Sequence, residues 1–265
     1  MAAHERPDVT FVVTKSNAPI FERNFAASPC LESLPPDRLI VQEGFASASL
    51  AYNDAIERAK TDLLVFAHQD VYFPADWLSN LGKSLKLLES TDVDWGVLGG
   101  YGASSRGVWA GFLFSVGLGV VGAPFTRPVA IDTLDEYLLI LRKSSGLRFD
   151  PALPYFHFYG TDICLSARKQ GRACYAISAF CIHNTSYGYV APEFYKSYWD
   201  IKKKWRQSLP IQTPCIRITR WNRELVVRRF KELCFTVVGK NRQPRPRLED
   251  PSIVLNVATA VSEKR

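Results

Sequence analysis

The first hundred residues alternate short apolar runs with segments of helical spacing. The β-branched and aliphatic runs predict strands at residues 8–14, 37–43, 62–67 and 94–100. Amphipathic segments follow the first three runs and predict helices, the second opened by Ser47 and the third by Pro74. Strands that are apolar almost throughout and separated by amphipathic helices predict a mostly parallel sheet covered on both faces. The predicted fold class is therefore α/β.

One apolar segment, residues 107–126, has the length of a membrane span and carries no charged residue. It also contains five glycines between 107 and 122, and a proline at position 124. This composition suits close backbone turns better than a spanning helix. We interpret the segment as a Gly-rich strand and loop inside the domain, with a transmembrane helix as the alternative.

Composition and the start of the sequence indicate the size of the domain and the compartment of the protein. With 265 residues, of which 47% are hydrophobic and 12% aromatic, the chain can bury the core of one large domain, with or without an appendage. The start, "MAAHERPDVT", lacks the apolar region of a secretory signal, so export by that route is not expected. The six cysteines form no C-x-x-C pair, which argues against a zinc cluster or a redox pair. We expect reduced thiols in a cytoplasmic protein.

Polar side chains follow the predicted strands at their carboxyl ends, where open α/β sheets bind ligands. They are Thr14, Lys15, Ser16 and Asn17, then Glu43, then His68, Gln69 and Asp70. Each residue alone is an ordinary polar strand end, but together they indicate a site. On an extended backbone His68 and Asp70 point to the same side, and imidazole with carboxylate suits a divalent ion such as manganese. Because no phosphate-binding glycine loop follows the first strand, a phosphate-bearing ligand would be held largely through such an ion.

The segment "SASLAYNDAIERAKTDLLVFAHQDVYFPADWL" resembles the core of the GT-A-fold, family-2-type glycosyltransferases, whose third strand ends in Asp-x-Asp. It is most similar to the bacterial branch in which this motif reads His-Gln-Asp. The later segment "YGTDICLSARKQG" is similar to the Glu-Asp-x-x-Leu-x-x-Arg-x-x-x-x-Gly motif on the acceptor side of that family. The resemblance covers about residues 8–210 and implies a GT-A-type, Rossmann-like sheet flanked by helices.

The resemblance implies a metal-dependent, inverting glycosyltransferase that moves a sugar from a nucleotide-sugar to a hydroxyl acceptor, in bacterial polysaccharide or glycoconjugate synthesis. Asp70 and His183 would bind Mn²⁺ or Mg²⁺, and Asp162 would be the general base. His68 replaces the first aspartate of the usual motif, so it is open whether it binds metal, ribose or neither. The residues expected to contact the donor are Thr14, Asn17, Glu43, Asn53, His68 and Asp135.

The residues themselves leave alternatives open. Asp162 also fits the N-cap of a helix that begins at Thr161 or Asp162 and ends at Gly171. A lone histidine such as His183 is commonly a packed, hydrogen-bonded residue, and His157 is a competing candidate among aromatic neighbours. Of the three acids Asp132, Asp135 and Glu136, we expect Asp135 to lie near the donor or acceptor sugar.

Charge is distributed unevenly, with a net charge of −4 over residues 1–195 and +11 over residues 196–265. We expect a glycosyltransferase domain at 1–210, with a nucleotide-binding half at about 8–100 and an acceptor half at 101–210. A basic helical extension at 211–265 would follow, ending in a loosely ordered tail from residue 240. Its apolar residues at helical spacing are Trp221, Leu225, Val226, Leu233, Val237 and Val238.

A basic amphipathic helix over residues 220–238 fits either an anionic membrane surface or docking on the domain. The protein is then expected in the cytoplasm, with peripheral attachment to the inner face of the membrane if the helix binds lipid; the acceptor is a glycan or a lipid-linked one. Nucleic acid ranks lower, because no recognition motif accompanies the charge. The incomplete His-Gln-Asp and Gly-Thr-Asp motifs leave a non-catalytic sugar-nucleotide or glycan-binding relative as the alternative function.

Overall fold

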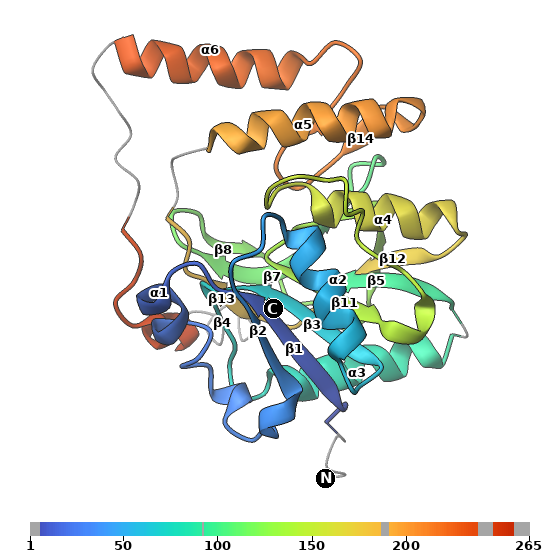
Figure 1. The fold of residues 1–265 in the computed structure, drawn as a ribbon, viewed down its shortest axis with the longest axis vertical. Coiled ribbons are helices and arrows are strands. Elements are labelled where there is room, and N and C mark those ends of the chain that lie inside the picture. Colours follow the sequence, from blue (N-terminus) through green and yellow to red (C-terminus); the bar gives the residue numbers. More distant parts are fainter. Residues whose placement is uncertain (1–5, 92, 187–190, 238–245, 257–265) are drawn as a thin grey trace.

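The computed structural model describes residues 6–91, 93–186, 191–237 and 246–256, and it places two sheets next to each other with helices around them (Figure 1). The α-helices are α1 (Ala18–Arg23), α2 (Ala48–Arg58), α3 (Trp77–Glu89), α4 (Tyr159–Lys169), α5 (Pro192–Lys204) and α6 (Arg223–Val237). Short 3-10 helices lie at Pro29–Leu31, Pro36–Arg38, Lys143–Ser145, Arg206–Ser208 and Pro251–Val254.

The main sheet has seven strands in the order β2-β1-β3-β11-β5-β12-β9. Their bounds are β1 Val9–Thr14, β2 Leu39–Gln42, β3 Leu63–His68, β5 Trp95–Gly99, β9 Val129–Ile131, β11 Leu138–Arg142 and β12 Ala173–Ala176. Strands β1, β2 and β3 run parallel, as do β5 and β12, whereas β11 and β9 run antiparallel to their neighbours. The prediction of a mostly parallel α/β sheet is confirmed, with β11 inserted between the third and fourth predicted strands.

Side chains of each central strand alternate between two cores, as a sheet covered on both faces requires. Phe11 and Val13 of β1 pack on the side of α3, where Trp77 is fully buried. Val12, between them, packs on the opposite side with Tyr52 of α2. The near-continuous apolar runs of the sequence therefore reflect burial on both faces.

The second sheet has the order β10-β6-β7-β13-β4, with β8 paired to β7. Its strands are β4 Val71–Tyr72, β6 Tyr101–Ala103, β7 Trp109–Ser115, β8 Gly119–Gly122, β10 Thr133–Leu134 and β13 Cys181–His183. The apolar segment 107–126 thus forms the β7–β8 hairpin, which confirms its interpretation as strand and loop. Gly122 has a φ of +75°, and a Cβ there would lie 1.9 Å from the Gly111 carbonyl oxygen, so the hairpin requires glycine at this position. Within the described residues, no helix combines the length and apolarity needed to cross a bilayer.

Of two predicted helix starts, one agrees with the structure and the other does not. Ser47 caps α2 as expected, because its Oγ accepts a hydrogen bond from the backbone N–H of Leu50. Helix α3, by contrast, begins at Trp77 and not at Pro74. The Pro74 carbonyl accepts a hydrogen bond from the Trp77 N–H, which closes a turn ahead of the helix.

Helix α4 begins earlier than the sequence predicts, so the N-cap interpretation of Asp162 is wrong. The cap residue is Phe158, which has a left-handed φ of 63° and donates its N–H to the Glu136 carboxylate. Asp162 already lies in the first turn, with its N–H donating to the Phe158 carbonyl. The predicted end of this helix is confirmed by Gly171, which takes a φ of +81° just after α4.

The chain after α4 forms a third core on top of the first two. Phe158 and Leu165 pack with Phe194 and Tyr198 of α5 and with Leu225 of α6. A small hairpin, β14 (Ile211–Gln212) with β15 (Arg217–Ile218), completes this layer. Helix α6 lies beyond α5, at the top of the view in Figure 1. The predicted basic helix is therefore present and docked.

The apolar residues of α6 do not share one face. Leu225 is buried against α5, whereas Trp221 before the helix and Val226 and Leu233 within it are exposed. On the α5 side, Arg229 stacks over the ring of Tyr195 with its Cζ atom 4.6 Å from the centroid. Val238, which the sequence placed on the same face, lies outside the described residues.

Part of the C-terminal tail packs on the domain. Within residues 246–256, Pro251 and Val254 are buried, and Val254 packs with Tyr72 of β4 and Ile182 of β13. Asp250 caps the last 3-10 helix by accepting the Ser252 N–H. The segment therefore packs on the two strands that carry the site described next through some of its apolar side chains, whereas Ile253 is 62% exposed.

Candidate metal centre

Strand pairing brings together residues from distant parts of the chain. His68 ends β3, where it lies in register with Thr14 of the parallel neighbour β1. Two residues later Asp70 precedes β4, and β4 pairs antiparallel with β13 so that His183 lies opposite Val71. The Asn184 N–H donates to the Asp70 carbonyl at 2.8 Å and extends this pairing. The edge of the sheet thus collects His68, Asp70 and His183.

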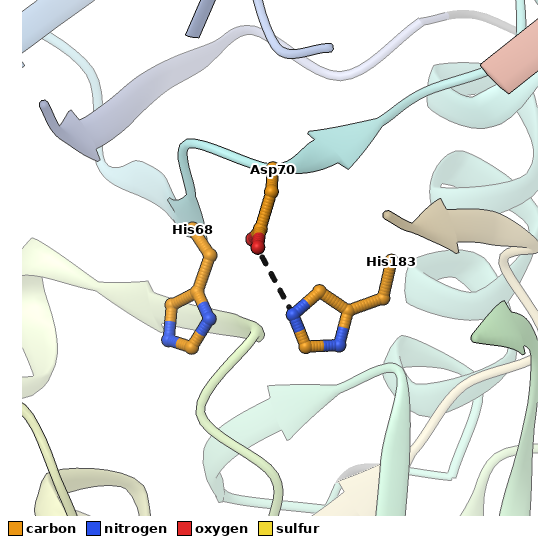
Figure 2. A group of neighbouring side chains, drawn as sticks. All are labelled: His68, Asp70 and His183. Carbon is orange, nitrogen blue, oxygen red and sulfur yellow. Dashed lines mark ion pairs between the residues drawn. The ribbon is translucent and has the colours of Figure 1, made fainter. Parts of the chain in front are cut away.

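Figure 2 shows the side chains of His68, Asp70 and His183 pointing toward one another. Each offers a ligand atom, and these atoms all lie within 4.8 Å of one another. His183 Nε2 lies 3.4 Å from Asp70 Oδ1, and Asp70 is only 7% exposed. Two imidazole nitrogens and one carboxylate oxygen suit a divalent transition ion and leave coordination positions for oxygen ligands. The group could therefore hold a divalent ion, and His68 lies within it.

Each imidazole is oriented by a tyrosine. His68 Nε2 lies 2.9 Å from the Tyr159 hydroxyl, and that hydroxyl donates to the Glu136 carbonyl oxygen at 3.0 Å. A hydroxyl has one proton to donate, so it accepts from His68 Nε2–H, and the lone pair of His68 stays on Nδ1. The His183 ring stacks on Tyr137, with centroids 5.3 Å apart. Sequence reasoning assigned no role to either tyrosine.

Electrostatics favours an ionised Asp70 beside a protonated His183 when no ion is bound. Burial alone would raise the pKa of Asp70, but His183, and then His68 and Arg247, hold it well below its usual range. Burial opposes the proton on His183, but Asp70 outweighs it and raises the pKa of that imidazole. Burial, and then the neighbouring His183, lower the pKa of His68 to about 4, so His68 is neutral at physiological pH.

Gln69, the middle residue of His-Gln-Asp, lies outside the metal-binding group and fixes the loop after β1. Its Oε1 accepts the backbone N–H groups of Ser16 and Asn17, both at 3.0 Å. Its Nε2 donates to the Ser16 hydroxyl at 2.9 Å. The three residues therefore differ in role. His68 and Asp70 face the metal position, and Gln69 holds the end of the neighbouring strand β1 in place.

The residues predicted to contact the donor lie at several points around this edge. Asn17 caps α1 by accepting the Ile20 N–H. Glu43 forms an ion pair with Lys15 at 2.6 Å. Asn53 uses its amide on the backbone of Phe149, donating to its carbonyl at 2.8 Å and accepting its N–H at 3.0 Å. Thr14 is the neighbour of His68 across the β1–β3 pair. Their contact with a donor stays a prediction.

The acidic segment before β11 faces His183. Burial raises the pKa of Asp135, with His183 acting in the opposite direction, and Asp135 accepts the Tyr137 N–H at 3.2 Å. Burial, and then Asp135, raise the pKa of Glu136 well above its usual range. Asp132 instead pairs with Arg168 at 3.1 Å.

Asp162 lies under the end of α5. It is 1% exposed, and its Oδ1 accepts the Trp205 indole N–H and the Lys204 ammonium, both at 2.7 Å. Burial raises its pKa, although Lys204 and Trp205 act against that rise. His157, the competing histidine, packs edge-on against Phe194 with ring centroids 5.6 Å apart. Neither Asp162 nor His157 belongs to the three-residue metal-binding group found among the described residues.

Comparison with known proteins identifies the fold. No protein-family model matches the chain. A relative from Fuscovulum blasticum, described as "ATP synthase subunits region ORF 6", is 26% identical over 168 residues, which are 60% of this chain and 66% of that protein. Among solved structures, GalNAc-T7 with UDP, GalNAc and Mn²⁺ is similar with a TM-score of 0.53 at 10% identity, covering 76% of this chain and 49% of that one.

Two further structures are similar at lower scores. S. aureus TarS has a TM-score of 0.47 at 14% identity, covering 75% of this chain and 39% of that chain. The mannosyltransferase PcManGT from Pyrobaculum calidifontis, in complex with GDP-Man and Mn²⁺, has a TM-score of 0.43 at 16% identity, covering 70% and 59%. The likeness to GalNAc-T7 shows that the chain has the GT-A-type fold, as the sequence predicts, and the chain spans about half the length of that protein.

We predict that Mn²⁺ affinity rises with pH until the pH exceeds the raised pKa of His183. His183 must lose its proton to bind the ion, and Asp70 raises the pKa of that imidazole above its ordinary 6.5. Below the pKa of His183, release of one proton weakens binding by up to about tenfold per pH unit. Titration calorimetry with MnCl₂ at several pH values measures the slope. His157→Gln should leave it unchanged, and affinity independent of pH would contradict the assignment of His183.

Proposed function

We propose that the protein is a metal-dependent, inverting glycosyltransferase that moves a sugar from a nucleotide-sugar to a hydroxyl acceptor, in bacterial polysaccharide or glycoconjugate synthesis. The observation that carries the proposal is the convergence of His68, Asp70 and His183 at the carboxyl edge of a GT-A-type sheet. The resemblance of the His-Gln-Asp segment to family-2-type glycosyltransferases supports it. So does the presence of a nucleotide or nucleotide-sugar with Mn²⁺ in two of the similar structures.

The three residues would hold the divalent ion through His68 Nδ1, a carboxylate oxygen of Asp70 and His183 Nε2. When bound, the ion supplies neutralisation of the charge that develops on the departing nucleoside diphosphate. Tyr159 and Tyr137 keep the two imidazoles in the orientation that directs their lone pairs inward. Thr14, Asn17, Glu43 and Asn53 are proposed to contact the nucleotide, and Asp135 the sugar.

We propose Asp162 as the general base. It would take the proton of the acceptor hydroxyl as the oxygen attacks the anomeric carbon and the bond from that carbon to the diphosphate breaks. Burial raises the pKa of Asp162, which is the direction that strengthens a carboxylate as a base. Trp205 and Lys204 fix one of its oxygens.

The same contacts favour the alternative function. A carboxylate held by an indole and an ammonium, both at 2.7 Å, also fits a purely structural ion pair at the base of α5. In that case the protein binds a nucleotide-sugar or a glycan through the metal centre without transferring the sugar.

Asp70→Asn tests the metal-dependent function. It removes the only charged oxygen ligand of the proposed set, so Mn²⁺-dependent binding of UDP or GDP should weaken by about 100-fold or more. Calorimetry with and without MnCl₂ measures this. Asp200→Asn, an exposed aspartate on α5, should bind as the wild type does. Unchanged metal-dependent affinity in a folded Asp70→Asn protein would refute the role of Asp70.

Asp162→Asn separates the two functions. If Asp162 is the base, nucleotide affinity should stay within about threefold while transfer falls by about 10²- to 10⁴-fold, because a base acts in the transition state. Asp150→Asn is the matched control, since Asp150 also pairs with Lys204. Product formation from radiolabelled nucleotide-sugars, including donor hydrolysis, measures turnover. Undiminished turnover of Asp162→Asn would exclude it as base, and a wild type that binds without turnover would favour the alternative function.

We propose that α6 attaches the protein to an anionic membrane surface, where a lipid-linked acceptor is presented. Val226, Phe230 and Leu233 follow one another at helical spacing on the side away from α5 and are 61%, 66% and 61% exposed. Trp221, just before the helix, is 77% exposed. The net charge of +11 over residues 196–265 complements anionic lipid, and each basic residue at such a surface adds about 1 kcal/mol of attraction.

Phe230→Ser with Leu233→Ser should therefore abolish binding to phosphatidylglycerol vesicles while leaving nucleotide affinity unchanged. Binding of the wild type should weaken as salt rises and should be lost on neutral phosphatidylcholine vesicles. Leu118→Ser, at an exposed apolar residue of the β7–β8 turn, is the matched control. Vesicle co-sedimentation measures all of these. A wild type that does not bind anionic vesicles at low salt would contradict the membrane role. Wild-type dimers that are lost in the double variant would show that the face binds protein and not lipid.

A further inference from the structure

The C-terminal segment 246–256, which follows α6 in the chain, lies beside the metal centre. Figure 1 shows it beside α1, and Arg23 of that helix pairs with Glu249 at 3.3 Å. The sequence gives no pattern that places it there, because "RPRLEDPS" has neither strand nor helix periodicity. It is nevertheless the only described part of the chain after α6.

Asn184 attaches this segment directly beside the proposed metal ligands. Its side chain is fully buried, accepts the Leu248 N–H at 2.7 Å and donates to the Leu248 carbonyl at 3.0 Å. The same amide nitrogen donates to Asn24 Oδ1 at 2.7 Å. Since Asn184 follows His183 and its own N–H binds the Asp70 carbonyl, the segment is held at a fixed position relative to both residues.

Arg247 is thereby placed on Asp70. Its Nη2 lies 3.3 Å from Asp70 Oδ2, on the oxygen that does not face His183. Within the residues the structure describes, Arg247 Nε is buried and has no hydrogen-bond partner. The side chain keeps 29% of its surface exposed. The guanidinium therefore contacts Asp70 through Nη2, and its other N–H donors include a planar set that can bind phosphate oxygens.

The contact between Arg247 and Asp70 competes with the binding of a metal ion at Asp70. A divalent cation on Asp70 would lie within a few ångströms of the guanidinium, and like charges at that distance repel strongly in a partly buried site. A nucleoside diphosphate brings at least two negative charges to the same place, and these attract both cations at once. Arg247 thus opposes the ion alone and supports the ion together with the diphosphate.

We propose that Arg247 couples metal binding to nucleotide binding: it neutralises Asp70 in the free protein and moves to the diphosphate when the ion takes Asp70. The inference rests on the proposed function and adds a diphosphate-binding residue to it. Each ligand then raises the affinity for the other, and the free protein resists occupation of the centre by an ion alone.

Arg247→Gln tests the coupling through two affinities that should change in opposite directions. Binding of Mn²⁺ alone should tighten by about threefold or more, because a neighbouring positive charge is removed. Binding of UDP or GDP at saturating Mn²⁺ should weaken by about tenfold or more, because a charge-assisted contact is lost. Titration calorimetry and the paramagnetic resonance of free Mn²⁺ measure both. Arg23→Gln, which removes the ion pair with Glu249 on the same segment, should change neither.

Arg247→Lys keeps the charge without the fork, so it should leave the affinity for Mn²⁺ alone close to that of the wild type and weaken the nucleotide only in part. This variant carries the test if Arg247→Gln does not fold. A wild type that binds Mn²⁺ and nucleotide, with both variants equal to it within twofold, would overturn the inference and leave the proposed function standing. A wild type that binds neither probe would overturn both.

Discussion

The candidate site depends on one constraint: the carboxylate of Asp70 is buried and must be compensated by charge. The strand pairing of β4 with β13 meets this requirement by bringing His183 to one oxygen of Asp70, and the returning tail brings Arg247 to the other. His68 adds a neutral imidazole at the third side. Asp70 therefore requires a cationic neighbour, and in this structure His183 and Arg247 lie on its two oxygens.

The sequence predicted the strands and their polar ends because both follow from local patterns. Asp70 closes an apolar run that could only be a strand, and Gly122 lies in a run too rich in glycine for a spanning helix. Contacts between residues that are far apart in the chain leave no such pattern in the sequence. Tyr159 reaches His68 only because Phe158 turns α4 into place with a left-handed backbone, a conformation rare outside glycine and hard to foresee for a bulky residue.

The same distinction applies to the C-terminal region. Helical spacing correctly predicted α6, but spacing could not tell that Leu225 would face α5 while Phe230 faced outward. The tail from residue 240 was expected to be loosely ordered because it is rich in proline and charge, yet Asn184 binds the backbone of Leu248 and not its side chain. Binding through backbone atoms carries almost no sequence signal, so a site completed in this way is recognisable only from the fold.

The last residue of the site comes from the segment that follows α6. Arg247 follows His68, Asp70 and His183 in the sequence, and the segment 246–256 holds it against Asp70 Oδ2. A chain cut before this segment would keep the strands that carry the two histidines and Asp70 but would leave that oxygen without the guanidinium. Proteolysis of the tail would therefore alter the charge at the centre as well as the packing around Val254.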